Sequence, residues 1–453
     1  MNRLEEYKNL LQEINEPVPE LETSLERAIH RKKRRNLIYR PFIGMAASFL
    51  LFVFLVNFSA PVAHACSQIP FLKELAEAVT FSRSLSDAVE HDYVQELKLT
   101  KTNGNVTATI EYLIVDQKQI NVFYRLQSDQ YNYMDGEPEL LSASTNEKLP
   151  CSTYWSRGNS TTDGELLSFT ADFGNENVPD TIKLQLFVIH YPNIEDETRE
   201  NDSNIFDIKN TVAEFEFLLE FDPSFTDAGR QIPVNQKLEL DGQNITISNI
   251  EIYPSHIRIN VEDDPANTSW LKELEFYLIA DGKEIFKPLA GGITATGDPD
   301  SPAMTSFRAD SSYFYEAKEL EFIVTGAVWL DKEKELAYIN LETGENKNLP
   351  EGVTFTEATE EEDGWHISVR TPFIKENSYY QTFGSYFYDT EEKEYISKGR
   401  SRTDDYENED SLKTHFIETI ELTDFHGKEV WISLHHSHRW ETSKPISLRI
   451  EMD

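Results

Sequence analysis

The stretch HRKKRRNLIYRPFIGMAASFLLFVFLVNFSAPVAHACS, from His30 to Ser67, decides the organisation of the whole chain. A basic cluster leads directly into a segment of 23 residues, Pro41 to Ala63, that contains no charged side chain. About 20 apolar residues in a helix are enough to cross the ~30 Å hydrocarbon core of a membrane. The sequence therefore predicts a transmembrane helix over residues 41–63.

Two other interpretations of this stretch stay open. A cleaved signal peptide has a short basic leader and an apolar region of about 7–15 residues, whereas here 40 residues precede a longer apolar segment. Ala63-His64-Ala65 nevertheless fits the small-x-small preference of signal peptidase. A lipid-modified Cys66 is less well supported, because Ala63 and His64 are poor choices before such a cysteine. We expect a retained anchor.

The basic cluster also indicates the orientation of the helix, because Lys and Arg are enriched on cytoplasmic flanks. The basic residues on the N-terminal flank are Arg31, Lys32, Lys33, Arg34, Arg35 and Arg40. We therefore expect a single-pass protein of the cell membrane, with its N-terminus in the cytoplasm and its C-terminus outside the cell.

The predicted cytoplasmic segment, residues 1–40, has two short apolar stripes at helical spacing, separated by Pro17 and Pro19. The residues of the stripes are Leu4, Tyr7, Leu11, Ile14, Leu21, Leu25 and Ile29. Isolated helices this short are marginal in water. We therefore expect the stripes to bind a partner, which could be another protein, the membrane surface or a second copy. A weak helical hairpin with fraying ends is the alternative.

Composition limits the partners of the exterior. The chain has 453 residues and a net charge of −38, and residues 1–40 have a net charge of +2, so the rest carries about −40. Such an acidic surface repels DNA, RNA and anionic lipid. With only two cysteines, Cys66 and Cys151, the exterior is not a disulfide-dense scaffold, and one bridge between them is an open possibility.

After the anchor, residues 69–79 have the apolar spacing of a juxtamembrane helix. From about Tyr93 the apolar residues alternate with polar ones, as in residues 106–112, 120–126 and 182–188, and Asn103-Gly104 predicts a hairpin turn. The fold class expected is mainly β, with tandem β-sandwich-like domains outside the membrane. The predicted division is 1–40 cytoplasmic helices, 41–63 transmembrane helix, 64–92 juxtamembrane helix and linker, and β domains at 93–225, 226–345 and 346–453.

No motif in the sequence predicts catalysis. There is no Gly-x-Ser-x-Gly and no His-Glu-x-x-His. The densest group of possible metal ligands is His435, His436 and His438, of which the last two would share one face of a strand; solvated strand histidines are the preferred interpretation. The acidic loops lack EF-hand spacing. These loops are Asp298-Pro299-Asp300, Asp363-Gly364 and Asp404–Asp410. We predict no enzyme activity, no metal site and no cofactor.

Aromatic residues are frequent near the C-terminal third. They could line a sugar-binding face, although core packing and cross-strand pairing explain most of them equally well. The residues concerned are Tyr379, Tyr380, Phe383, Tyr386 and Phe387.

The segment Val56 to Phe71, which ends in Ala-Cys-Ser-Gln-Ile-Pro-Phe, together with Ala78-Val-Thr-Phe81, resembles a Gram-positive family called domain of unknown function 4179. The resemblance covers roughly residues 40–130, with Ser59-Ala60-Pro61 where the family usually has Ser-Pro. Residues 230–345 are similar, more loosely, to an associated extracellular module of unknown function.

The resemblance implies a short cytoplasmic segment, one membrane helix and a β-rich exterior. Such proteins are often encoded beside extracytoplasmic-function sigma factors and described as anti-sigma-factor-like regulators. The cytoplasmic segment departs from zinc-type anti-sigma domains, because it has no Cys and its only His is His30. We expect a membrane-anchored regulator whose stripes bind a cytoplasmic partner, such as a sigma factor, and whose exterior senses a ligand that the sequence does not identify. The alternative is a surface-displayed binding or structural protein of the cell envelope.

Overall fold

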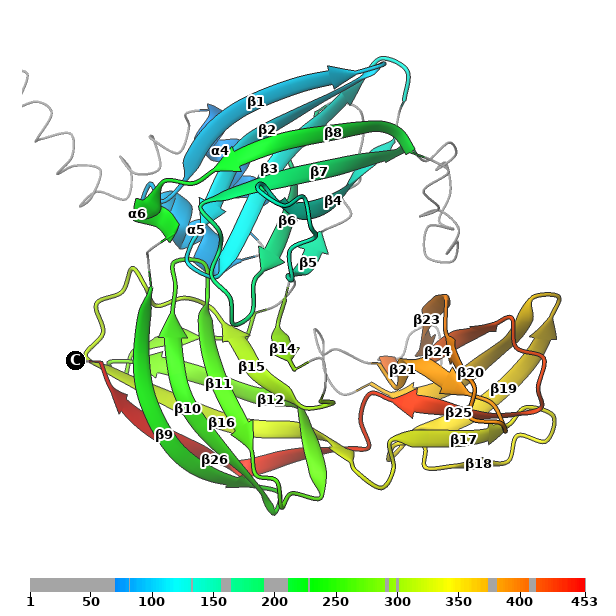
Figure 1. Ribbon diagram of the computed structural model, residues 1–453. Helices are drawn as coiled ribbons and strands as arrows, with labels where there is room; N and C mark the ends of the chain where they lie inside the picture. The colour runs from blue at the N-terminus through cyan, green and yellow to red at the C-terminus, as the bar shows by residue number, and fades with distance from the viewer. Residues whose placement is uncertain are drawn as a thin grey trace, which may run out of the picture. The chain divides into compact units, whose positions relative to one another are not determined.

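The computed structural model describes residues 70–80, 82–131, 133–155, 164–190, 211–226, 229–289, 293–298, 301–373, 381–406 and 413–452 (Figure 1). In this part of the chain the fold is mainly β, built from antiparallel sheets, as the sequence predicts. None of the helices in the described ranges is long and apolar enough to cross a membrane. The predicted cytoplasmic segment and the predicted transmembrane helix both lie outside the described residues.

Two helices precede the first strand. The first is α4 (Pro70–Ala78), which lies where the apolar spacing of residues 69–79 predicts a helix. A second helix, α5 (Arg83–Glu90), was not predicted. It begins at Ser82, whose Oγ accepts a hydrogen bond from the backbone N–H of Leu85 at 3.3 Å. The buried face of α5 is short and mixes small polar and apolar residues: Ser84, Leu85, Ala88 and Val89.

The first β unit consists of two sheets that face one another across an apolar core. The predicted turn at Asn103-Gly104 is confirmed, with Gly104 at a positive φ of 58°. One sheet has the order β1-β2-β3-β6-β5 and the other β4-β7-β8. The strands are β1 (Gln95–Asn103), β2 (Val106–Val115), β3 (Gln119–Ser128), β4 (Met134–Ser142), β5 (Ser152–Trp155), β6 (Leu167–Asp172), β7 (Thr181–His190) and β8 (Thr211–Glu220).

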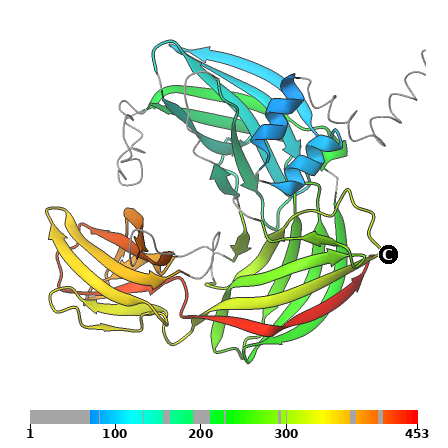
Figure 2. The same cartoon turned by 180° about the vertical axis from the view of Figure 1, so that it is seen from behind.

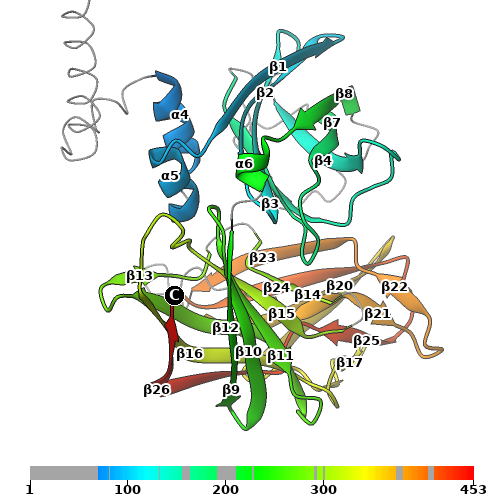
Figure 3. The ribbon, with the colours of Figure 1, turned by 60° about the vertical axis from the view of Figure 1, so that its left-hand side comes forward.

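After a short helix, α6 (Pro223–Thr226), the second β unit is also a pair of sheets, and the strands of one cross those of the other (Figures 1 and 3). The sheet orders are β14-β15-β11-β10-β9 and β13-β12-β16-β26. The strands are β9 (Arg230–Leu240), β10 (Gln243–Ile252), β11 (Ile257–Asp263), β12 (Ser269–Ala280), β13 (Glu284–Phe286), β14 (Ala295–Gly297), β15 (Met304–Ala309), β16 (Glu319–Asp331) and β26 (His438–Glu451).

The third β unit again has two sheets around its own core. Their orders are β18-β17-β25-β21-β22 and β19-β20-β24-β23. The strands are β17 (Leu336–Asn340), β18 (Asn346–Lys347), β19 (Thr354–Glu361), β20 (Gly364–Pro372), β21 (Phe383–Tyr388), β22 (Glu394–Ile396), β23 (Gly399–Tyr406), β24 (Lys413–Thr423) and β25 (Glu429–Leu434).

The limits of the second and third units differ from those expected at residues 345 and 346. The strand β17, expected in the second unit, pairs with β25 of the third. The last strand, β26, expected in the third unit, returns to pair with β16 of the second and runs along that sheet as the red ribbon in Figure 2. The third unit is therefore an insertion between two neighbouring strands of the second unit's sheet, because β16 and β26 both remain there.

Two adjacent leucines on β8 give a matched test of the first core. Leu219 is fully buried, whereas Leu218 is 51% exposed. We expect Leu219→Ala to lower the local free energy of unfolding by about 2–5 kcal/mol, since it removes buried methyl groups and leaves a cavity. Leu218→Ala should change it by less than about 0.5 kcal/mol.

The measurement is hydrogen-exchange mass spectrometry in increasing urea, followed on peptides from β7 and β8. Equal losses of protection in the two variants would contradict the assignment of alternate β8 side chains to the core.

Candidate functional site

The residues predicted to bind a cytoplasmic partner all lie outside the described residues, and so do those predicted to set the topology. The former are Leu4, Tyr7, Leu11, Ile14, Leu21, Leu25 and Ile29; the latter are Arg31, Lys32, Lys33, Arg34, Arg35 and Arg40. Their roles stay predictions. Cys66 also lies outside. Burial raises the pKa of the Cys151 thiol to about 11.

The three histidines near the C-terminus do not converge. The chain between β25 and β26 is irregular at His435 and His436, so the expectation that His436 and His438 share one face of a strand is wrong. Nδ1 of His436 lies 3.2 Å from a backbone carbonyl, whereas Nε2 of His438 lies 3.1 Å from Oδ2 of Asp241. The described residues contain no group of three or more His, Cys, Asp or Glu side chains that could hold a metal ion.

The aromatic residues singled out in the sequence have different environments. Tyr379 and Tyr380 lie outside the described residues. Phe383 and Phe387 are fully buried in the core of the third unit, and Tyr386 is 48% exposed.

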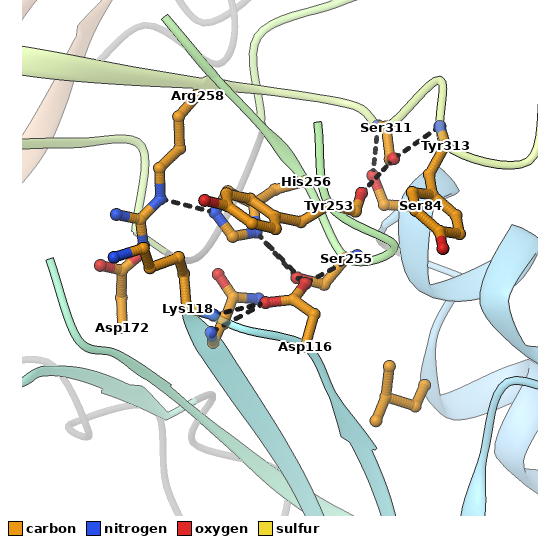
Figure 4. A network of polar contacts seen from close by, with 12 residues as sticks. Ser84, Asp116, Lys118, Asp172, Tyr253, Ser255, His256, Arg258, Ser311 and Tyr313 are labelled. Atoms are coloured by element: carbon orange, nitrogen blue, oxygen red, sulfur yellow. Dashed lines mark hydrogen bonds and ion pairs between the residues drawn. The ribbon is translucent and has the colours of Figure 1, made fainter. Parts of the chain in front are cut away.

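The most concentrated polar chemistry in the described structure is a buried set of charged and polar side chains shared by the first two β units (Figure 4). We call it the junction cluster. Its members from the first unit are Asp116, Lys118 and Asp172, and those from the second are Glu251, Ser255, His256, Arg258 and Arg308.

Asp116 joins the turn between β2 and β3 to the second unit. Its Oδ1 accepts hydrogen bonds from the backbone N–H groups of Lys118 and Gln119, at 3.0 and 2.9 Å, which closes the turn. Its Oδ2 accepts from the backbone N–H of Ser255 at 3.1 Å and from the Ser255 hydroxyl. Burial raises the pKa of Asp116, against the lowering effect of these hydrogen bonds.

The junction cluster contains the residue types of a catalytic Ser-His-Asp triad: Ser255, His256 and Asp116. The directions of their hydrogen bonds, however, do not fit such a triad. Arg258 donates from Nε to Nε2 of His256 at 2.9 Å, so Nε2 is an acceptor and the ring proton is on Nδ1. Nδ1 lies 2.7 Å from Oγ of Ser255 and therefore donates to it, while the hydroxyl donates to Asp116. His256 cannot accept the serine proton in this arrangement, and all three side chains are buried.

Asp172, at the end of β6, lies between two arginines of the second unit. Its Oδ2 accepts from Arg258 at 2.8 Å and from Nε of Arg308 at 3.2 Å, and its Oδ1 accepts from Nη2 of Arg308 at 3.2 Å. The backbone N–H of Gly174 also donates to Oδ1 at 2.8 Å. The carboxylate and both guanidinium groups are almost completely buried, so each charge depends on the others for stabilisation.

The remaining charges complete a balanced set of three carboxylates and three cations. Lys118 donates to two backbone carbonyls, and Glu251 accepts from the hydroxyl of Tyr253 at 2.9 Å. Burial lowers the pKa of Lys118, and the charge of Arg258 adds to this effect. Burial likewise lowers the pKa of Arg308, to about 10, although Asp172 opposes the shift.

The helix α5 is bound to the same region. The backbone N–H of Ser311 donates to Oγ of Ser84 at 2.7 Å, and the Ser311 hydroxyl donates to the carbonyl of Tyr253, beside the junction cluster (Figure 4). Arg83 donates to the carbonyl of Ile285 at 2.9 Å and pairs with Glu284, both in the second unit.

Two aromatic residues just after α5, His91 and Tyr93, contact the second unit and the helix α6. The ring of His91 stacks on Phe314 of the second unit, with centroids 4.5 Å apart. Tyr93 donates from its hydroxyl to the carbonyl of Phe225 in α6 at 2.9 Å, and its ring packs edge-on against Phe225 and Phe314. The segment from α5 to Tyr93 thus contacts the second unit directly and the connection between the two units.

Sequence reasoning did not identify the junction cluster. In Ile257-Arg-Ile-Asn-Val261 the alternation puts Arg258 on the face opposite the core, where solvent is expected, yet Arg258 is only 2% exposed. The first unit covers it through Asp172. The only signal in the sequence is that each arginine lies between two apolar neighbours, Arg258 between Ile257 and Ile259 and Arg308 between Phe307 and Ala309.

The contribution of the buried charge of Asp172 to stability can be compared with that of an exposed aspartate, Asp424. We expect Asp172→Asn to lower the free energy of unfolding by about 3–5 kcal/mol, because it leaves Arg258 and Arg308 buried without their counter-charge. Asp424→Asn breaks an exposed pair, 3.2 Å from Lys398, and should cost less than about 1 kcal/mol. The measurement is the melting temperature of each full-length variant relative to the unchanged protein. Equal decreases in the two variants would contradict the structural role of Asp172.

His256 gives the junction a predicted pH dependence. Burial, with the charges of Arg258 and Arg308, holds the pKa of His256 well below 6.5, so it stays neutral where an exposed histidine takes up a proton. Its contribution to stability is therefore complete at high pH and is lost as the pH falls through 6.5, by up to about 1.4 kcal/mol at pH 5.5. Asp116 acts in the opposite direction, because its raised pKa favours the protonated native form.

The histidine effect is isolated by comparing the unchanged protein with His256→Gln. Hydrogen exchange of peptides from β10 and β11, corrected for intrinsic rates, should lose more protection between pH 7.5 and 5.5 in the unchanged protein. The same pH dependence in both proteins would contradict the prediction.

The chain is similar to two families of unknown function. Residues 33–128 match the family model described as Domain of unknown function (DUF4179), and residues 229–359 match the one described as Family of unknown function (DUF5643). A solved structure described as the conserved domain protein from Bacillus anthracis is 15% identical, with a TM-score of 0.39; the similarity covers 56% of this chain and 85% of that one. No curated protein matches the chain. The resemblance to family 4179 is thus confirmed over residues 33–128.

Proposed function

We propose that this protein is a membrane-anchored regulator of the anti-sigma-like type. It binds a cytoplasmic partner, an extracytoplasmic-function sigma factor, through the apolar stripes of its N-terminal segment. Its acidic β units lie outside the cell and sense an external condition there. The predicted anchor, residues 41–63, joins the two sides.

The observation that carries the proposal is the attachment of α5 to the β units. A surface protein that needs only a tether can follow its anchor with a free linker. Here the segment that follows α4 is bound through Ser84 and Arg83 to the second unit and through Tyr93 to the connection between the units. A change at the junction cluster therefore has a path of hydrogen bonds to α5, which follows α4 and the predicted membrane segment in the chain, and a transmitter requires such a path.

The first test is affinity purification of the full-length protein from detergent-solubilised membranes, with mass spectrometry of the co-eluting proteins. We expect a sigma factor that is lost on Leu11→Asp or Leu25→Asp, since a charge in an apolar contact is strongly unfavourable. Gln12→Asp and Thr23→Asp, which lie off the stripes, should retain it. Absence of a cytoplasmic partner, or a partner that Leu11→Asp does not affect, would contradict the proposal.

The contribution of α5 is tested with the same assay. Arg83→Ala removes the contacts with Ile285 and Glu284, whereas Glu90→Ala changes an exposed residue of the same helix. We expect Arg83→Ala alone to change the amount of partner retained.

A second candidate function is a surface-displayed binding protein, in which the N-terminal segment is only a tether. The observation that favours it is the pair of exposed side chains Tyr386 and Ile396 on the third unit, 48% and 57% exposed. Under this alternative, deletion of residues 3–29 leaves function intact.

A further inference from the structure

The outer face of one sheet of the third unit has an uncommon composition. Directly paired residues form one row across all five strands of the sheet β18-β17-β25-β21-β22, and paired residues of antiparallel strands lie on the same face. In order across the sheet, the row is Lys347, Tyr338, Trp431, Tyr388 and Glu394. With about 4.8 Å between strands, the row is roughly 19 Å long and its three aromatic residues span roughly 10 Å.

A second row beside the first adds two exposed apolar side chains, Tyr386 and Ile396. Tyr386 pairs directly with Ile396, and these side chains are 48% and 57% exposed. Leu336 pairs with Ser433, whose hydroxyl donates to the carbonyl of Tyr386 at 2.7 Å. A contiguous aromatic and aliphatic surface of this kind, on the outside of a folded unit, is typical of an interaction site.

Carboxylates surround the aromatic rings. The hydroxyl of Tyr338 donates to Glu429 at 2.7 Å, and that of Tyr388 donates to Glu394 at 2.9 Å. The hydrogen bond with Glu429 raises the pKa of Tyr338, and the charge of Glu345 acts in the same direction. Burial raises the pKa of Tyr388, with further contributions from Glu394 and Glu335. The four carboxylates named, of Glu335, Glu345, Glu394 and Glu429, outnumber the one ammonium group of the row, that of Lys347.

The face already binds a cation of its own. The ammonium group of Lys347 lies 5.2 Å from the centroid of the Tyr338 ring, and it also pairs with Glu345 at 3.5 Å. This is the geometry of a cation–π contact supported by a carboxylate. Trp431, whose ring centroid is 5.2 Å from that of Tyr338, lies next in the row, and Tyr386 is more exposed than either.

We propose that this face, which we call the aromatic face, binds a cationic peptide segment that carries both Lys or Arg and apolar side chains. The cationic groups lie over the rings of Trp431 and Tyr386 and pair with Glu394 and Glu429, while the apolar side chains cover Ile396. The net charge of −38 attracts such a ligand from a distance and repels nucleic acid and anionic lipid. A length of roughly 19 Å corresponds to about six residues of extended chain.

The inference holds under either candidate function, because it concerns only the ligand that reaches the third unit. A neutral oligosaccharide can also stack on the rings and donate hydrogen bonds to the carboxylates, but it carries no charge for them to attract. Binding of a sugar is therefore an outcome that the experiment must separate from binding of a cationic peptide.

The test is a binding titration of full-length protein in a non-ionic detergent. Isothermal titration calorimetry measures the binding at 25 and at 200 mM salt. The probe is an amidated peptide of four Lys-Leu-Gly repeats. Its comparisons are the same peptide with Glu in place of Lys, and a neutral hexasaccharide of N-acetylglucosamine. We expect saturable binding of the lysine peptide alone, weaker at the higher salt concentration.

Variants locate the binding on the aromatic face. Tyr386→Ala and Trp431→Ala should each weaken binding by about fivefold or more. Glu394→Gln and Glu429→Gln should weaken it and reduce its salt dependence. The matched controls are Tyr154→Ala, an exposed aromatic residue of the first unit, and Glu361→Gln, an exposed carboxylate of the other sheet of the third unit. Both should bind within about twofold of the unchanged protein, as expected for residues outside the contact.

Three outcomes overturn the inference. The lysine peptide does not bind, or the hexasaccharide or the glutamate peptide binds at least as well, or the control variants weaken binding as much as the variants on the aromatic face. Because Tyr386, Glu394 and Ile396 are exposed, their substitution leaves the core intact. An unchanged melting temperature for Tyr386→Ala separates loss of binding from loss of folding.

Discussion

The carboxylate of Asp172, buried between Arg258 and Arg308, is the constraint on which the rest of the junction depends. A buried guanidinium group without a counter-charge is costly, and two of them close together repel each other as well. The counter-charge comes from another β unit. Any other arrangement of the two units would therefore leave buried charges without a partner. A cluster of this kind contributes to specificity of arrangement more than to net stability.

The helix α5 is attached close to the junction cluster. Its polar contacts with the second unit are made by Ser84 and Arg83, and two hydrogen bonds through Ser311 connect Ser84 to the carbonyl of Tyr253, which precedes Ser255 and His256. The neighbouring contacts of Tyr93 are aromatic and reach α6. A change at the junction is therefore connected to α5 through Ser311, and the proposed transmission to the chain that precedes the β units would use this connection.

The sequence was informative wherever structure is local. Alternation of apolar residues predicted β2, β3 and β7, Asn103-Gly104 predicted the first hairpin, and apolar spacing predicted α4, because each depends on neighbours within about ten residues. The return of β26 to pair with β16 could not be predicted in this way, since a strand's alternation does not specify its partner. The stripe of α5, Leu85, Ala88 and Val89, is only about one turn long, which is too short to predict a helix from spacing.

The junction cluster was beyond sequence reasoning for a physical reason. Alternation divides a strand into a core face and a solvent face, and Arg258 lies on the face that alternation assigns to solvent; only contact with another unit buries it. The junction cluster joins residues that are far apart in the sequence, whereas three histidines that are close in the sequence do not form a site. His435, His436 and His438 have different partners where the chain passes from the third unit to the second. Proximity in sequence and shared chemistry are not sufficient to define a site.

We infer that the junction cluster holds α5 and the first two β units as one body. Double electron–electron resonance tests it on a full-length chain without Cys66 and Cys151, labelled at the exposed positions Glu90 and Glu239, or Glu90 and Glu147. We expect one narrow distance distribution for each pair of labels, and we expect Asp172→Asn to broaden it. Broad distributions with the junction intact, or narrow ones that Asp172→Asn leaves unchanged, would contradict this inference.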